Sequence, residues 1–171
     1  MKGYLQVYTG TGKGKTTAAL GLALRASGAG LRTYIGQFIK KGDYSEIRAL
    51  KKLAGAVTVR QYGRGCFVRG KPSLMDIEAA QRGMAELRRA MLGGDYDLVI
   101  ADELNPAVRC GLVDVDDLLR LADDKPENVE LVVTGRDAHP RLRRRADLVT
   151  DMRCVKHYYS GGVRARKGME C

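Results

Sequence analysis

The stretch Tyr4-Leu-Gln-Val-Tyr-Thr-Gly-Thr-Gly-Lys-Gly-Lys-Thr-Thr-Ala-Ala-Leu20 decides the fold of this chain. An apolar segment is followed by a loop with three glycines, by a Lys-Thr-Thr sequence, and by a segment rich in alanine and leucine. A strand, a glycine-rich loop, a Lys-Thr pair and a helix in this order are typical of a phosphate-binding loop. An ordinary glycine-rich turn before a helix is the alternative, and the order of these features argues against it.

The loop supplies the residues that we expect to bind a nucleotide. Glycines at 10, 12 and 14 let the backbone curl so that its N–H groups point at an anion. The helix that begins near Thr16 presents its positive dipole end to the same point. Lys15 adds a full charge, and a threonine hydroxyl can ligate Mg²⁺. The predicted nucleotide-binding residues are Gly10, Thr11, Gly12, Lys13, Gly14, Lys15, Thr16 and Thr17.

The loop is one residue shorter than the common Gly-x-x-x-x-Gly-Lys-Thr pattern. The residue five positions before Gly14 is Thr9, so the chain reads Gly10-x-x-x-Gly14-Lys15-Thr16. A shortened loop with a second lysine, Lys13, need not hold a nucleotide in the usual pose. The pose matters because it decides which bond of ATP faces the second substrate.

The length and composition predict a single domain over residues 1–171 with an aliphatic core. The chain has 171 residues, of which 44% are hydrophobic and only 6% aromatic, so aliphatic side chains must fill the core. No apolar run approaches the roughly 18–20 residues of a membrane span. The first strand starts almost at Met1, which leaves no room for a signal peptide, and we therefore expect a cytoplasmic protein.

The net charge of +10 predicts an anionic partner. Nucleotide phosphates, nucleic acid and other polyanions all fit, because charge alone does not identify the anion. The densest basic cluster lies at 141–145, and a solvated helix face is its alternative interpretation.

Apolar runs alternate with helical patterns along the whole chain, which predicts an α/β fold. We expect a mostly parallel sheet flanked by helices, in a phosphate-loop NTPase-like (RecA-like) three-layer sandwich. A basic, glycine-rich tail from Ser160 either covers a ligand or frays. The predicted strands are 4–9, 31–39, 57–62, 98–101, 129–133 and 148–155, and the predicted helices are 16–27, 44–53, 73–92, 114–124 and 140–145.

A second nucleotide-binding element is predicted where the fourth strand ends in Asp102 and Glu103. In phosphate-loop proteins a carboxylate at this place helps to hold Mg²⁺. If this strand lies beside the first one, both carboxylates come near Thr16, and Thr16, Asp102 and Glu103 form a metal site. Two solvated acids at a strand end are the alternative.

Basic residues follow two further strands. Arg136 comes after the fifth strand, and Lys40 and Lys41 come after the second. Ligands bind at the carboxyl edge of open α/β sheets, so these side chains are candidates for phosphate contacts. Basic residues at the surface without a ligand are the alternative.

Taken together, these stretches resemble the ATP:corrinoid adenosyltransferases that adenosylate cobalamin and its precursors. The shortened loop is this family's own form, and the matching stretches cover nearly the whole chain in the right order. They are Val7-Tyr-Thr-Gly-Thr-Gly-Lys-Gly-Lys-Thr-Thr-Ala-Ala19, Gly36-Gln-Phe-Ile39, Asp97-Leu-Val-Ile-Ala-Asp-Glu-Leu-Asn105, Val133-Thr-Gly-Arg136, Ala146-Asp-Leu-Val-Thr-Asp-Met152, Val155-Lys-His157 and Gly162-Val-x-Ala-x-x-Gly-Met-Glu170.

The resemblance implies that Co(I) of a corrinoid attacks C5′ of ATP and that the whole triphosphate leaves, in adenosylcobalamin biosynthesis or salvage. It implies that ATP sits reversed relative to most phosphate-loop proteins, which presents C5′ outward. Lys15, Glu103 and Arg136 are the implied catalytic residues, and Mg²⁺ (or Mn²⁺) accompanies ATP. A reductase for Co(II) and a homodimer are implied as well, whereas neither nucleic acid nor a membrane is.

One part of the chain departs from the family pattern. Better-known members carry Gly-Phe-x-Trp in the loop that faces the corrinoid, whereas this chain reads Gly63-Arg-Gly-Cys-Phe-Val-Arg-Gly70. The aromatic residue is shifted by one and the tryptophan is missing. Phe67 is the residue expected to face the corrinoid, and an ordinary loop anchor is its alternative role.

Two other functions remain open from the residues alone. A phosphate-loop kinase or ATPase would use the same loop, although Thr9 replaces the expected glycine and no base is evident. A nucleotide-gated nucleic-acid-binding protein would use the charge, although two phenylalanines and no tryptophan leave few surfaces for base stacking.

Overall fold

A computed structural model of the chain describes residues 2–53, 55–65 and 70–170. Its strands are β1 (Leu5–Thr9), β2 (Thr33–Gln37), β3 (Val57–Gln61), β4 (Leu98–Asp102), β5 (Glu130–Thr134) and β6 (Leu148–Asp151). Its helices are α1 (Lys15–Gly28), α2 (Ser45–Lys51), α3 (Leu74–Leu92), α4 (Leu104–Arg109), α5 (Val115–Asp123) and α6 (Pro140–Arg145), with a 3₁₀ turn η1 (Tyr158–Gly161).

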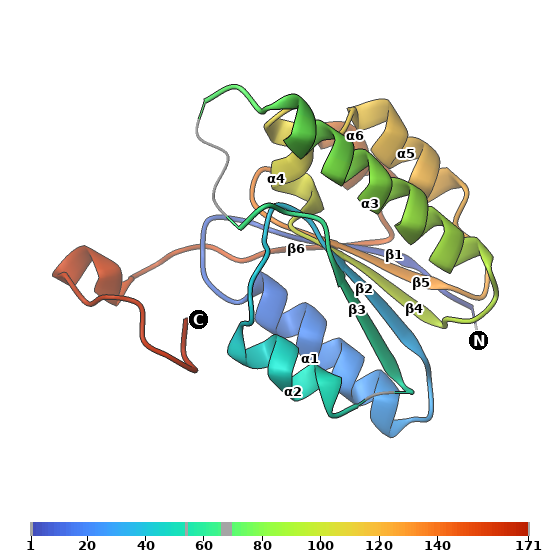
Figure 1. Ribbon diagram of the computed structural model, residues 1–171, viewed down its shortest axis with the longest axis horizontal. Helices are drawn as coiled ribbons and strands as arrows, with labels where there is room; N and C mark the ends of the chain where they lie inside the picture. The colour runs from blue at the N-terminus through green and yellow to red at the C-terminus, as the bar shows by residue number, and fades with distance from the viewer. Residues whose placement is uncertain (1, 54, 66–69, 171) are drawn as a thin grey trace.

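The described strands form one parallel sheet in the order β3-β2-β4-β5-β1-β6. Helices α1 and α2 cover one face, and α3, α4, α5 and α6 cover the other (Figure 1). The predicted three-layer α/β sandwich is therefore confirmed. All strands run in the same direction, so the loops that follow them meet at one edge of the sheet.

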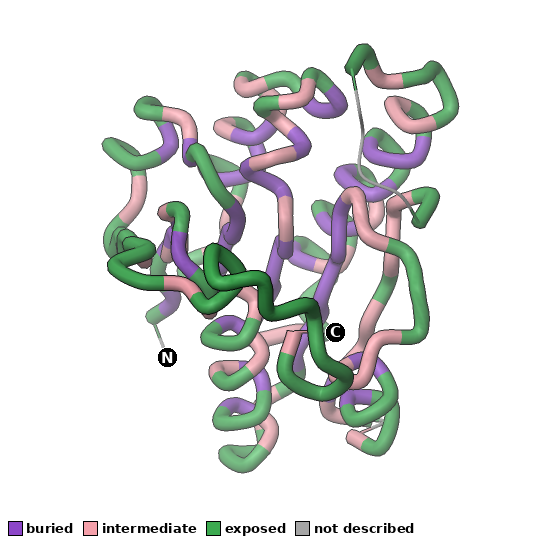
Figure 2. The backbone as a smooth tube through the Cα atoms, turned by 90° about the vertical axis from the view of Figure 1, so that its left-hand side faces the viewer, coloured by how far each residue is buried: buried purple, intermediate pink, exposed green. Residues whose placement is uncertain are grey.

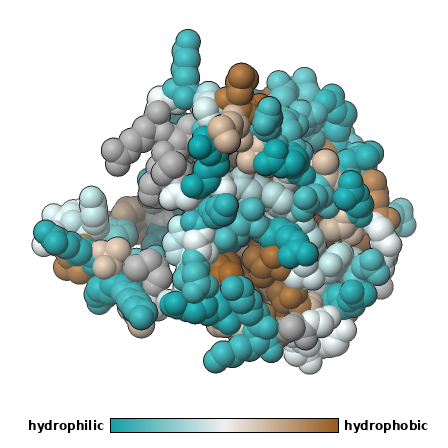
Figure 3. All heavy atoms as spheres, viewed as in Figure 1, coloured by the Kyte–Doolittle hydropathy of each residue, from teal (hydrophilic) through white to brown (hydrophobic). Residues whose placement is uncertain are grey.

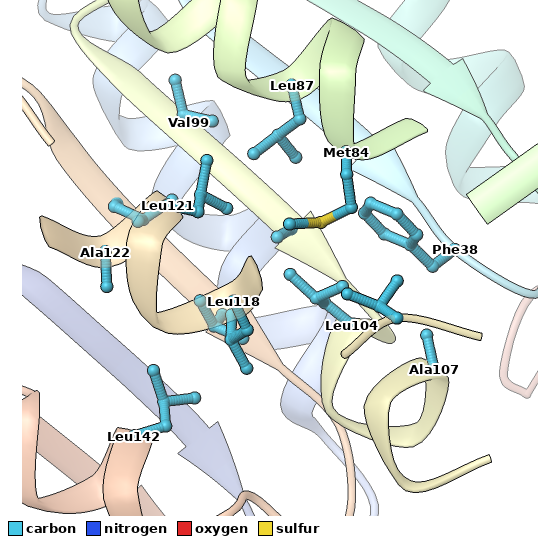
Figure 4. Packing of buried hydrophobic residues seen from close by; sticks show 14 of the residues in the cluster. Phe38, Met84, Leu87, Val99, Leu104, Ala107, Leu118, Leu121, Ala122 and Leu142 are labelled. Atoms are coloured by element: carbon cyan, nitrogen blue, oxygen red, sulfur yellow. The ribbon is translucent and has the colours of Figure 1, made fainter. Parts of the chain in front are cut away.

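The central strands are buried on both faces. Every residue of β2 and β4 is buried, as expected for a parallel sheet covered by helices on both sides. Alternate residues of a strand feed two separate cores: Leu131 and Val133 pack toward α3 and α5, and Val132 packs toward α1. Figure 2 shows the buried strands inside an exposed outer layer, and Figure 4 shows aliphatic side chains filling the larger core.

The surface is mainly hydrophilic in the view of Figure 3, with a few hydrophobic side chains grouped near its centre. Among the described residues, no helix is both long enough and apolar enough to cross a bilayer.

The structure corrects three expectations. Strand β5 lies between β1 and β4, so the strand that ends in Asp102 is not beside the first strand. Helix α4 was not predicted, and β6 ends at Asp151 rather than at residue 155. Helix α3 begins after Ser73, whose hydroxyl and the Asp76 carboxylate form a reciprocal N-terminal cap.

Candidate nucleotide-binding site

The phosphate-binding loop connects β1 to α1 and packs against the segment that follows β6. Gly10 and Gly14 have φ values of 99° and 119°, in the left-handed region that favours glycine. The Gly12 N–H donates to the Met152 carbonyl at 2.6 Å, and a Cβ at Gly12 would lie 2.7 Å from the same oxygen. The close approach of the two segments therefore requires a residue without a side chain at position 12.

Lys15 begins α1, and its ammonium is turned back into the loop. The ammonium donates to the carbonyl oxygens of Gly10 at 2.8 Å and Gly12 at 2.6 Å, and the residue is only 8% exposed. Burial lowers the pKa of Lys15, and the nearby charge of Arg136 lowers it further. Arg136 makes no hydrogen bond or ion pair with the described residues. The positive charges of Lys15 and Arg136 therefore repel each other near the loop, and a bound polyanion would reduce this repulsion.

Asp102, the last residue of β4, has no exposed surface and accepts hydrogen bonds from three neighbouring elements. Its Oδ1 accepts from the Thr16 hydroxyl at 2.9 Å and from the Thr134 hydroxyl at 2.7 Å. Its Oδ2 accepts from the Gln37 amide at 3.1 Å. The carboxylate thus connects the phosphate-binding loop to β2 and β5, although β4 is not adjacent to β1.

Lys40 approaches the same carboxylate from the loop after β2. Its ammonium lies 3.8 Å from Asp102 Oδ2, 3.2 Å from Glu103 Oε1 and 3.4 Å from Thr16 Oγ1. Burial alone would lower the pKa of Lys40, but the charges of Asp102 and Glu103 outweigh it and raise the pKa. Lys40 is therefore held as a cation among the three oxygen-bearing side chains predicted to bind metal.

These oxygen-bearing side chains fit Mg²⁺ in its usual protein setting. Mg²⁺ prefers hard oxygen ligands and usually keeps waters and phosphate oxygens around it instead of an all-protein cage. Thr16, Asp102 and Glu103 supply hard oxygens. In the described part of the chain, no group of three or more His, Cys, Asp or Glu side chains is arranged to hold a metal ion. A metal at this place would therefore take part of its ligands from the nucleotide.

The C-terminal segment folds back onto the phosphate-binding loop and is held there by contacts with Lys13. The Lys13 ammonium donates to Glu170 at 2.9 Å, to the Met169 carbonyl at 2.7 Å and to the Tyr158 hydroxyl at 3.1 Å. Figure 2 looks onto the strand ends, with this exposed segment in front of them. The tail thus engages one of the two lysines predicted to neutralise a triphosphate.

The remaining predicted residues lie in varied positions. Thr11 and Thr17 are exposed, and the Thr11 hydroxyl accepts from the Cys154 N–H at 3.4 Å. Phe67 lies outside the described residues. Among the arginines of 141–145, Arg141 pairs with Asp116 and Arg145 pairs with Asp123, which favours the interpretation as a helix face.

Three polar residues at this edge have no role in the sequence-based prediction. Thr134 and Gln37 hold Asp102, and Asn105 is 1% exposed with its amide donating to the Gly135 carbonyl at 3.2 Å. The Asn105 side-chain oxygen is buried with no hydrogen-bond partner among the described residues. Gln37 and Thr134 are the last residues of two buried strands, and a polar residue at such a position could have identified them from the sequence.

A cavity of about 540 Å³ is lined by residues of α3 and α4, by the segment that leads into α5, and by the start of α6. Its lining includes Gln81, Arg109, Asp137 and His139. Of the predicted site residues that the structure describes, none lines it. The charge pattern at the strand ends therefore identifies the nucleotide site better than the size of this cavity does.

Comparisons with known proteins agree with the pattern of the residues. Residues 1–171 match the family model described as ATP:corrinoid adenosyltransferase BtuR/CobO/CobP. A corrinoid adenosyltransferase of Pseudomonas aeruginosa is 34% identical over 170 residues, covering 99% of this chain and 84% of that protein. The corrinoid adenosyltransferase of Escherichia coli K12 is 31% identical, with 99% and 86% covered.

The fold resembles that of a solved structure from a different kind of protein. The KaiC-like protein PH0186 of Pyrococcus horikoshii superposes with a TM-score of 0.58 and 18% sequence identity. The superposition covers 88% of this chain and 73% of that chain. At this identity the similarity supports the three-layer α/β sandwich and nothing further.

Replacing Thr134 by valine should destabilise the fold, because the change removes one donor to the buried Asp102 and the acceptor of the Glu103 N–H. We expect a loss of about 1–3 kcal/mol in the free energy of unfolding, measured by urea denaturation. Thr150→Val on exposed β6 is the matched control, expected to stay within about 0.5 kcal/mol of the parent. Equal effects of the two substitutions would contradict the role of Thr134.

The tail should stay attached on mild acidification. Hydrogen bonds from Arg166, Tyr158 and Lys13 hold the pKa of Glu170 far below its usual 4.5. A carboxyl with a lowered folded-state pKa contributes stability that is complete above pH 4.5 and is lost only as the pH falls through the lowered value. Amide hydrogen exchange of the 158–170 segment, corrected for intrinsic rates, should therefore show the same protection at pH 7 and pH 5.5.

Glu170→Gln should accelerate exchange in that segment at both pH values, because the charge that attracts Lys13 and Arg166 is removed. Glu78→Gln, on the exposed surface of α3, should leave it unchanged. Unchanged protection in Glu170→Gln would mean that other contacts hold the tail.

Proposed function

The chain belongs to the ATP:corrinoid adenosyltransferase family, and from this premise we propose that it transfers the 5′-deoxyadenosyl group of ATP to Co(I) of a corrinoid and releases triphosphate. The observation that carries the proposal is the shortened loop, which bears Lys13 and Lys15 and has Arg136 near enough to lower the pKa of Lys15. The polyphosphate is the leaving group here, so these cations act on the bond that breaks.

The proposed reaction requires side chains that stabilise negative charge, and it does not require side chains that transfer protons. An electron pair of Co(I) forms the bond to C5′, the C5′–O bond breaks, and the triphosphate leaves with that bond's electron pair. Negative charge therefore develops on the triphosphate, where loop N–H groups and preorganised cations stabilise it most effectively. The step needs no general base, and Asp102 is already engaged in three hydrogen bonds.

Each charged residue has a role in this proposal. Lys15 and Lys13 bind the triphosphate from the loop, and Arg136 binds it from the end of β5. Thr16 and Glu103 would hold Mg²⁺ or Mn²⁺, with Asp102 orienting Thr16. The metal supplies additional neutralisation of the leaving group when bound.

Further features complete the proposal. We take residues 1–171 to be one nucleotide-binding adenosyltransferase domain that works as a homodimer and receives Co(I) with the help of a reductase. We place the corrinoid against the 63–70 loop, with Phe67 facing it. The free thiols of Cys110 and Cys154 support a location in the cytoplasm, where cysteines stay reduced.

The decisive experiment mixes the purified protein anaerobically with Mg·ATP and a chemically reduced Co(I) corrinoid. We expect loss of the Co(I) absorbance, a light-sensitive alkyl-cobalt product and one triphosphate per product. ADP and phosphate as the only turnover products would instead indicate a kinase or an ATPase. A mixture without protein measures the uncatalysed reaction.

Lys15→Ala should lower kcat/KM for ATP by about 100-fold or more, because it removes a buried cation from the developing charge of the leaving group. Lys52→Ala, at the end of α2, is the matched control and should keep the parent value. Activity retained by Lys15→Ala would show that the loop does not hold the triphosphate.

A further inference from the structure

Lys40 has a position that neither the loop pattern nor the metal pattern explains. Its ammonium lies within 4 Å of Asp102, Glu103 and Thr16, the same side chains that fit a divalent cation. Its side chain is 27% exposed, so it enters the site from the loop after β2 and keeps contact with solvent.

A strained turn directs Lys40 toward these oxygens. The Lys40 N–H donates to the Phe38 carbonyl at 2.6 Å, and Ile39 between them has a φ of 65°. This is the γ-turn form with positive φ, which is rare, and a β-branched residue seldom adopts it. Such strain persists only where the surroundings enforce it.

The surroundings enforce the turn from both sides. Phe38 is fully buried, close to Met84 and Leu104 (Figure 4), and its N–H donates to the Asp102 carbonyl at 2.9 Å. On the other side, a Cβ at Gly63 would lie 1.9 Å from the Ile39 carbonyl oxygen. The backbone before Lys40 is thus fixed, while its side chain keeps the freedom of a flexible stem.

Lys40 and a divalent cation compete for the same oxygens. An ammonium at these oxygens would repel a magnesium ion that approached the same oxygens. A metal that arrives alone must displace Lys40 without compensation. A metal that arrives with a triphosphate brings new acceptors for the displaced ammonium.

We propose that Lys40 is an exchangeable cation, which neutralises Asp102 and Glu103 in the nucleotide-free enzyme and transfers to the triphosphate when metal and ATP bind together. The proposal rests on the proposed function in one respect, because it takes a triphosphate as the ligand. It makes the site selective for the metal–nucleotide complex over the free metal ion.

The test measures Mn²⁺ binding by electron paramagnetic resonance, with and without ATP, in the absence of corrinoid. In Lys40→Met, free Mn²⁺ should bind about tenfold more tightly, because its competitor is removed. Mn·ATP should bind about tenfold more weakly, because one phosphate contact is lost. Lys52→Met, at the exposed C-terminal end of α2, should match the parent in both titrations.

Tighter binding of free Mn²⁺ together with weaker binding of Mn·ATP by Lys40→Met would support the exchange. Changes of the same sign, no change, or no measurable binding of free Mn²⁺ by Lys40→Met would overturn it. Lys40→Gln keeps a hydrogen-bond donor without the charge and should show the same opposite changes if the methionine variant does not fold. Because no corrinoid is present, failure of this inference is separate from failure of adenosyl transfer, which the triphosphate assay reports.

Discussion

A carboxylate with no exposed surface, Asp102, imposes the constraint on which this edge of the sheet depends. A buried charge is costly unless hydrogen bonds and an opposite charge surround it. The hydroxyl of Thr16, the amide of Gln37 and the hydroxyl of Thr134 supply the hydrogen bonds, and Lys40 supplies the charge. These partners come from α1, β2, β5 and the loop after β2. The hydrogen bonds and the ion pair of Asp102 therefore fix the relative positions of four segments.

Local sequence patterns predicted most of the strands and helices. The order of the strands could not be predicted, because it depends on pairing between segments that are distant in the sequence. The phosphate-binding loop and the buried strands follow from spacing and apolar runs, which neighbouring residues determine. Strand order depends on contacts far apart in the sequence, so β5 between β1 and β4 could not be predicted. Helix α4 has only six residues and contains Pro106, too short a segment for helical periodicity to appear.

The same division applies to the candidate site. Thr16 and Asp102 stand out because each belongs to a local motif, whereas Gln37 and Thr134 matter only through the neighbours of β4. Gln37 is paired in register with Asp102 across β2 and β4, so a known strand order would have identified it. The contacts of Lys13 with the tail were equally inaccessible, since they join residues more than 140 positions apart.

Three lysines at this edge already have partners within the protein, and these partners affect how tightly a nucleotide would bind. Lys13 is held by Glu170, Lys15 by carbonyl oxygens of its own loop, and Lys40 by Asp102 and Glu103. In the proposed reaction a triphosphate would replace these oxygens, so only the difference between the two sets of contacts would contribute to its affinity. Arg136 has no such partner among the described residues, so in the proposed reaction it would bind a phosphate without giving up another acceptor. On this proposal, nucleotide binding at this edge is an exchange of hydrogen-bond acceptors, and the protein's own contacts would hold the lysines in place before the nucleotide binds.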